Sequence, residues 1–138
     1  LHVGPGTFLP VKTENVSEHT MHREAYQISA TTAARLNDFC KPQKKGRLIA
    51  VGTTSVRVLE SQPAGRILPH AGSTNIFIRP PYQFQRVDAL LTNFHFPKST
   101  LLMLVSALIG REKMLETYRT AVEEEYRFYS YGDCMLIL

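Results

Sequence analysis

Residues 90–110 read LLTNFHFPKSTLLMLVSALIG and contain the clearest fold signal in the chain. Ser99 and Thr100 stand directly before the apolar run 101–109, and Gly110 follows that run. A serine or threonine before an apolar run is typical of a helix start, and glycine is typical of the position after a helix end. Because the run has no polar face and is too short to cross a membrane, it predicts a buried helix.

The loop before this helix is rich in polar side chains. It carries Asn93, His95 and Lys98, and it follows a strand predicted at 87–92. Helix N-termini hold partial positive charge and free N–H donors, and open α/β sheets bind ligands at the carboxyl ends of strands. We therefore expect a binding pocket here. The plain alternative is a capped core helix behind a loop that is merely polar.

The composition is that of one ordinary globular domain covering residues 1–138. Hydrophobic residues make up 43% and charged residues 20% of the chain, and 138 residues can enclose one core. The net charge of +4 is compatible with a nucleic-acid partner without requiring one. Cys40 and Cys134 lie far apart and form no CxxC pair, so they indicate neither a disulfide framework nor a zinc site. Without such a framework, the expected location is cytoplasmic. No run of about 18 apolar residues suggests a membrane span.

Strand and helix patterns alternate along the chain. Residues 48–51 read as a short buried strand, and the turn GTTS at 52–55 leads into a helix containing Val56 and Leu59. Further strands are expected at 25–28, 76–79, 87–92 and 134–138, with helices after Ser29 or Thr31 and at 111–127. This alternation predicts the α/β class, with a layered, mostly parallel sheet and flanking helices. The apolar segment 134–138 suits an inner strand.

The helix predicted at 111–127 is amphipathic. Leu115, Tyr118, Val122 and Tyr126 recur at spacings of three and four, so we expect these side chains to form its apolar face. The acidic run 123–125 is expected to face solvent.

Two motifs in the first part of the chain carry weaker signals. Gly4 and Gly6 flank a proline, which allows a sharp turn that presents N–H groups to a ligand. The third glycine and the helix of a dinucleotide fingerprint are absent. His19 and His22 would share one face of a helix, so a metal pair is conceivable. The plain alternative is a pair of surface or hydrogen-bonded histidines.

Five blocks together resemble one family. They are HVGPGTFLPV at 2–11, EHTMHREAY at 18–26, AVGTTSVRVLES at 50–61, VDALLTNFHFPKSTLLMLVSALIGRE at 87–112 and YRFYSYGDCMLI at 126–137. In content and order they resemble the S-adenosylmethionine:tRNA ribosyltransferase-isomerases of queuosine biosynthesis. Phe96 departs from the leucine that is usual in that family, and Pro81 departs from a more usual glycine.

The resemblance implies a tRNA-modifying transferase-isomerase. Such an enzyme moves the ribosyl part of S-adenosylmethionine onto 7-aminomethyl-7-deazaguanine at the tRNA wobble position, giving epoxyqueuosine and releasing adenine and methionine. S-adenosylmethionine is then a co-substrate, no metal is expected, and the full-length enzyme is expected to be a monomer. The family fold joins an α/β domain to an inserted β-barrel. This sequence resembles the carboxyl-terminal part of the α/β domain, without its amino-terminal part or the barrel.

The expected site residues lie inside these blocks. The chemistry requires a general base beside a sulfonium cation and an acid for departing adenine, and histidine is the commonest base near neutral pH. The catalytic candidates are His2, His22, His95 and Asp88, with Glu24 and Asp133 as further acids. The candidates for binding S-adenosylmethionine are Gly4, Gly6, Thr7, Thr53, Thr54, Arg57, Asn93, Ser99 and Thr100. Arg57, Lys98 and Arg127 could bind a carboxylate or tRNA phosphates.

Two other interpretations remain open. One is a non-catalytic nucleotide-binding fragment of the same enzyme. The other is a metal-dependent hydrolase that uses His19, His22 and His95.

Overall fold

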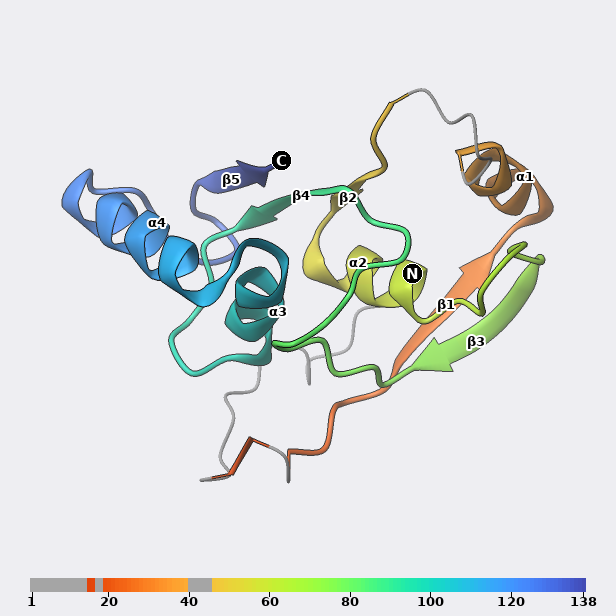
Figure 1. The fold of residues 1–138 in the computed structure, drawn as a ribbon, viewed down its shortest axis with the longest axis horizontal. Helices are drawn as coiled ribbons and strands as arrows, with labels where there is room; N and C mark the ends of the chain where they lie inside the picture. Colours follow the sequence, from red (N-terminus) through yellow and green to blue (C-terminus); the bar gives the residue numbers. More distant parts are fainter. Residues whose placement is uncertain (1–14, 17–18, 40–45) are drawn as a thin grey trace.

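The computed structural model describes residues 15, 16, 19–39 and 46–138 (Figure 1). Its elements, in chain order, are β1 (Glu24–Ile28), α1 (Ala30–Phe39), β2 (Ile49–Val51), α2 (Thr53–Glu60), β3 (His70–Thr74), β4 (Ala89–Asn93), α3 (Thr100–Ile109), α4 (Arg111–Glu123) and β5 (Cys134–Ile137). The α/β class expected from the sequence is confirmed. No helix in these ranges is long and apolar enough to cross a membrane.

The strands form two small sheets. One has the order β2-β4-β5, and the other pairs β1 with β3. The β2–β4 pair is parallel, whereas β4–β5 and β1–β3 are antiparallel. The expectation of a mostly parallel sheet is therefore wrong for the described strands. The reason is that two helices, α3 and α4, connect β4 to β5 and return the chain to the end of β4 that it had left, where Asn93 pairs with Cys134.

Helix α3 forms as the sequence predicts. The Ser99 hydroxyl accepts a hydrogen bond from Leu102 N at 3.2 Å, which satisfies one of the free N–H groups of the first turn. At the other end, Gly110 has φ 86, a conformation that glycine adopts without the Cβ penalty. Leu104 and Val105 are fully buried in the core between α3 and the sheet.

Helix α2 connects two hydrophobic cores. Val56 packs in the larger core with Leu90, Leu104 and Ile137, and Val58 packs in a smaller core beneath β1 and α1. Figure 1 shows α2 between the two sheets. Because α2 contributes to both cores, a change in the contacts of α2 is expected to affect the stability of both.

The strand expected at 76–79 is not formed. The second strand of the small sheet is instead β3 (His70–Thr74), in a stretch rich in prolines and glycines for which no strand was expected. The backbone groups of Ile76 form hydrogen bonds with side chains instead of with a neighbouring strand. Ile76 N donates to Thr74 Oγ1 at 3.2 Å, and Ile76 O accepts from Arg57 Nε at 3.2 Å. These contacts replace the ladder bonds that a strand would need.

Helix α4 is shorter than expected, and its buried face is different. It ends at Glu123, where Tyr126 N donates to Ala121 O and Glu125 takes a positive φ of 58, which is the geometry of a Schellman end. Met114 and Ala121 are its buried residues. Val122, expected on the apolar face, is 65% exposed, and Leu115 and Tyr126 are 42% and 48% exposed.

One face of the three-stranded sheet is open in the described part of the chain. Ile49 and Val51 of β2 are 48% and 67% exposed, and Leu136 of β5 is 54% exposed. Among the described strands β5 lies at an edge of its sheet, so the expectation of an inner strand is not met here.

The turn before β5 gives the first testable prediction. A Cβ added to Gly132 would collide with the backbone oxygen of Arg127 and would lie 2.5 Å from Phe128 O. Backbone atoms cannot swing aside, so Gly132→Ala should lower the free energy of unfolding by about 2–3 kcal/mol. Urea denaturation of the purified chain measures this. Ser130→Ala, in the exposed part of the same turn, should change it little, and equal effects of the two substitutions would contradict the steric argument.

Candidate active site at the carboxyl ends of β2 and β4

The ends of the parallel strands β2 and β4 lie at one edge of the sheet. Gly52 N, just after β2, donates to Leu91 O of β4 at 2.8 Å, which ties the two strand ends together. Thr53 begins α2 directly after β2, and Asn93 closes β4. Ligands of open α/β sheets bind at this edge. The structure thus brings two of the expected polar blocks to neighbouring positions.

A small pocket opens beside β4 and the start of α3. It has a volume of about 60 Å³, and its wall includes Asn93, His95, Phe96, Ser99 and Tyr129. This is room for about two water molecules, so the pocket can hold one edge of a ligand but cannot enclose a nucleoside. The three polar residues expected from the loop and helix start are therefore together, with two aromatic rings beside them.

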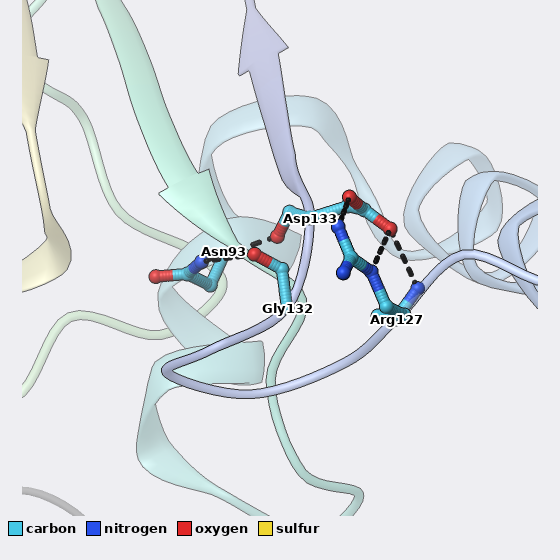
Figure 2. Close-up of polar contacts among 4 residues, drawn as sticks. All are labelled: Asn93, Arg127, Gly132 and Asp133. Carbon is cyan, nitrogen blue, oxygen red and sulfur yellow. Dashed lines mark hydrogen bonds and ion pairs between the residues drawn. The ribbon is translucent and has the colours of Figure 1, made fainter.

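Asn93 fastens the turn before β5 to the end of β4. Figure 2 shows its amide directed at the backbone of that turn, where Nδ2 donates to Asp133 O at 3.1 Å and lies 3.5 Å from Gly132 O. The hydrogen bonds of the Asn93 amide nitrogen are thus made to the backbone of the turn and not to a ligand. The carbonyl end of the side chain remains the part of Asn93 that can face a ligand.

Asp133 and Arg127 are occupied with each other. Arg127 donates to the Asp133 carboxylate from Nη2 at 2.9 Å and from its backbone N at 2.8 Å (Figure 2). The hydrogen bonds from the Arg127 side chain lower the pKa of Asp133, so the carboxyl group stays ionised at neutral pH. This argues against the expected role of Asp133 as an acid.

His95 is held on two sides. Its Nε2 lies 3.0 Å from Thr92 Oγ1, and its backbone N donates to the Tyr118 hydroxyl at 2.9 Å. Burial lowers the pKa of His95 to about 4. The imidazole is therefore neutral at pH 7 and can accept or donate a hydrogen bond. A base with so low a pKa takes a proton weakly, so proton transfer here would need a bound anion that raises the pKa.

The low pKa of His95 predicts a pH-dependent stability. The unfolded chain binds a proton at this residue near pH 6.5, whereas the folded chain resists it down to about pH 4. The contribution of neutral His95 to the free energy of unfolding is thus complete above about pH 6.5 and is lost as the pH falls toward 4. Between pH 7 and pH 5 the free energy of unfolding should drop by about 2 kcal/mol from this source. Urea denaturation at both pH values should show that His95→Asn lacks this part of the drop, and an identical drop in both proteins would contradict the pKa.

Arg57 of α2 and Glu24 of β1 form a buried ion pair. Arg57 Nη1 lies 3.2 Å from Glu24 Oε1, and both side chains are almost fully buried. Arg57 also donates to His22 O at 3.0 Å and to Ile76 O. Burial raises the pKa of Glu24, while Arg57 and a hydrogen bond with Thr54 oppose this rise.

The structure places four of the expected site residues in or next to this cluster. Arg57 is 2% exposed and all its described partners are internal, so it braces β1 and α2 and does not fit the expected role of carboxylate or phosphate binder. Thr54 is 7% exposed and lies in the same cluster. Thr53, 5% exposed, begins the helix at the strand end. His22 offers its carbonyl to Arg57, and its side chain is exposed.

Asp88 lies at the other end of β4. Its Oδ2 accepts from Leu48 N at 2.7 Å, and its backbone N donates to Leu48 O at 3.0 Å. These bonds align the amino ends of β2 and β4, opposite to the pocket. The structure therefore does not bring Asp88 together with His95, and a catalytic role for Asp88 does not fit this placement.

The remaining expected residues divide into three groups. Thr100 is the first residue of α3 and is buried, and Lys98 is exposed. His2, Gly4, Gly6 and Thr7 lie outside the described residues. His19, His22 and His95 form no metal-binding group, since no three His, Cys, Asp or Glu side chains gather within the described ranges. Residues 19–23 are not helical, so the expected shared helix face of His19 and His22 is wrong.

Sequence reasoning missed several residues of the site. Tyr118 was expected only as part of an apolar helix face, and Thr92 only as a strand residue, yet both hold His95. Tyr129 received no role, although it lines the pocket. Their spacing in the sequence carries no signal for these contacts. The one available hint is that Thr92 and Tyr129 lie within the blocks that carry the family resemblance.

The chain is similar to known proteins over nearly all its length. A family model described as "Queuosine biosynthesis protein" matches residues 1–137. The S-adenosylmethionine:tRNA ribosyltransferase-isomerase of Vesicomyosocius okutanii is 55% identical over 138 residues, and that of Cupriavidus pinatubonensis is 59% identical over 139 residues. Each match covers 99% of this chain but only 40% and 39% of the respective relative.

A solved structure agrees with these matches. The crystal structure of an S-adenosylmethionine tRNA ribosyltransferase from Thermotoga maritima at 2.00 Å resolution is 46% identical in sequence, with a TM-score of 0.75. The match covers 83% of this chain and 40% of that chain. The chain therefore spans about 40% of the length of the proteins it matches.

Proposed function

Because the chain belongs to the queuosine biosynthesis protein family, we propose that it supplies part of the α/β domain of an S-adenosylmethionine:tRNA ribosyltransferase-isomerase. The observation that carries this proposal is an identity of 55% and 59% over 99% of the chain to two relatives of that name. The proposed reaction transfers the ribosyl part of S-adenosylmethionine to 7-aminomethyl-7-deazaguanine in tRNA. It yields epoxyqueuosine, adenine and methionine.

The proposed partners follow from the reaction. They are S-adenosylmethionine as co-substrate and a tRNA that carries 7-aminomethyl-7-deazaguanine at the wobble position. We further propose that the enzyme works in the cytoplasm as a monomer and without a metal. The net charge of +4 favours an approach to the anionic tRNA backbone.

The proposed site is the pocket at the end of β4. Asn93, His95 and the Ser99-Thr100 helix start would contact the ligand, with Thr53 at the neighbouring strand end. The N-terminus of α3 favours an anionic group such as the methionine carboxylate. That anion would lie close to His95 and would raise its pKa from about 4, which improves it as a base. His2, His22, Gly4, Gly6 and Thr7 remain expected contributors from the amino-terminal blocks.

A chimera tests this proposal. In it, the chain replaces the matching 39% of the Cupriavidus pinatubonensis relative. With S-adenosylmethionine and a tRNA carrying 7-aminomethyl-7-deazaguanine, the chimera should release adenine and form epoxyqueuosine, detected by chromatography and mass spectrometry. The chain alone, assayed in parallel, tests the alternative of a fragment that binds nucleotide without catalysis. A folded chimera that binds both substrates and releases no adenine would overturn the proposed function.

A further inference from the structure

Two aromatic rings lie stacked on the surface beside the pocket. Phe96, in the loop after β4, and Tyr129, in the turn before β5, have ring centroids 3.7 Å apart and an interplanar angle of 19°. They are 50% and 43% exposed. The other aromatic pairs in the described ranges are edge-on or tilted, so this is the stacked pair among them. A stacked pair with an open side is a platform on which a further flat ring can lie.

The platform is held in place by the backbone. Tyr129 N donates to Phe94 O at 3.0 Å, Gly132 N donates to Tyr129 O at 3.0 Å, and the Ser99 hydroxyl donates to Phe96 O at 2.7 Å. Tyr129 has φ 73, in the left-handed region that costs a non-glycine residue about 1–2 kcal/mol. Residues kept in such conformations cluster at functional sites.

The surroundings of the platform select a nucleobase. Asn93, His95 and Ser99, which are proposed above to contact S-adenosylmethionine, line the adjoining pocket, so a base stacked on the platform would lie next to that site. Lys98, also with a positive φ of 56, is exposed two residues after Phe96. A flat aromatic face with a nearby cation matches a base attached to a phosphate backbone.

The open geometry favours RNA over the adenine of S-adenosylmethionine. Small co-substrates are usually buried over most of their surface, and the pocket of about 60 Å³ cannot enclose an adenine. Single-stranded RNA loops, in contrast, are bound by stacking splayed bases on exposed aromatic side chains. Phe96 and Tyr129 are themselves half exposed, so the platform is accessible in the described part of the chain.

We propose that Phe96 and Tyr129 form a stacking platform for one unpaired base of the tRNA anticodon loop, next to the nucleotide that is modified. This inference rests on the proposed function for the identity of the RNA. Tyr129 is the ring to replace, since its described hydrogen bonds are made by its backbone and survive substitution of the side chain.

The experiment measures tRNA affinity of the chimera at fixed salt. Tyr129→Leu keeps an apolar side chain but removes the ring, and should weaken binding of the tRNA roughly 5- to 150-fold. Tyr129→Phe should restore affinity. Tyr126→Leu is the matched control, because Tyr126 is also half exposed in this segment but packs against Phe94. Affinity that Tyr129→Leu leaves unchanged would overturn the platform.

Two further measurements separate the explanations. A stacking contact should leave the slope of log affinity against log salt unchanged in Tyr129→Leu, whereas Lys98→Gln should reduce it by about 0.7 if this lysine meets a phosphate. Loss of S-adenosylmethionine affinity in Tyr129→Leu without loss of tRNA affinity would identify the ring as an adenine contact and overturn the inference. Because these are binding readouts, a chimera that binds tRNA without releasing adenine refutes the proposed function and still tests the platform.

Discussion

Arg57→Met should lower the free energy of unfolding by about 3–5 kcal/mol, since it leaves the Glu24 carboxylate buried without its cationic partner. The His22 and Ile76 carbonyls also lose their donor. Burial already raises the pKa of Glu24, and removal of Arg57 should raise it further. Urea denaturation of the purified chain, followed by circular dichroism, measures the loss. If the unaltered chain is less stable than this loss, the Arg57→Met variant will be unfolded even without urea.

Two variants make this prediction specific. In Glu24→Leu/Arg57→Met no charge is left buried, so the double variant should be more stable than Arg57→Met alone. Arg127→Met removes an arginine from an exposed ion pair with Asp133 and should have little effect, because solvent screens that pair. A small loss in Arg57→Met, or no recovery in the double variant, would show that the buried pair is not what holds β1 to α2.

His95→Gln should lower turnover of the chimera roughly 10²- to 10⁴-fold if His95 transfers a proton. Glutamine keeps a hydrogen-bonding group of similar reach but cannot exchange a proton near pH 7. Binding of S-adenosylmethionine and tRNA should persist, so the loss appears in kcat. The His95 pKa of about 4 adds a second expectation. The fall of kcat/KM at acid pH that is caused by protonation of His95 in the free enzyme should have its midpoint near pH 4.

His70→Gln is the matched control. His70 lies in β3, where it contacts Tyr26 and the Leu68 carbonyl, away from the pocket residues. The same change there should leave turnover almost intact. If His95→Gln retains more than about a tenth of the turnover of the unaltered chimera, His95 is a hydrogen-bonding residue and not a proton-transfer residue.

The local sequence pattern was sufficient to predict the helices and strands whose ends are set by neighbouring residues. The buried helix α3, its Ser99 cap and Gly110 end follow from an apolar run between a hydroxyl residue and a glycine. The strand β2, the turn after it and α2 were likewise predictable, as was the placement of Asn93 at a strand end. The expected burial of β2 was wrong for Ile49 and Val51, which are exposed in the described part of the chain. The family resemblance, carried by five ordered blocks, agrees with the match over residues 1–137.

The tertiary structure determined what depends on contacts between distant residues. Strand direction in the β4–β5 pair depends on how two helices return the chain, which no single segment encodes. The side chain of Arg57 lies on a helix whose sequence gives no sign that Glu24, 33 positions earlier, will meet it in the interior. Likewise the amide of Asn93, the hydroxyl of Tyr118 and the ring of Tyr129 take their roles from partners on other elements. Periodicity reports which face of an element is apolar, but the partner of a buried polar group is set by packing across the fold.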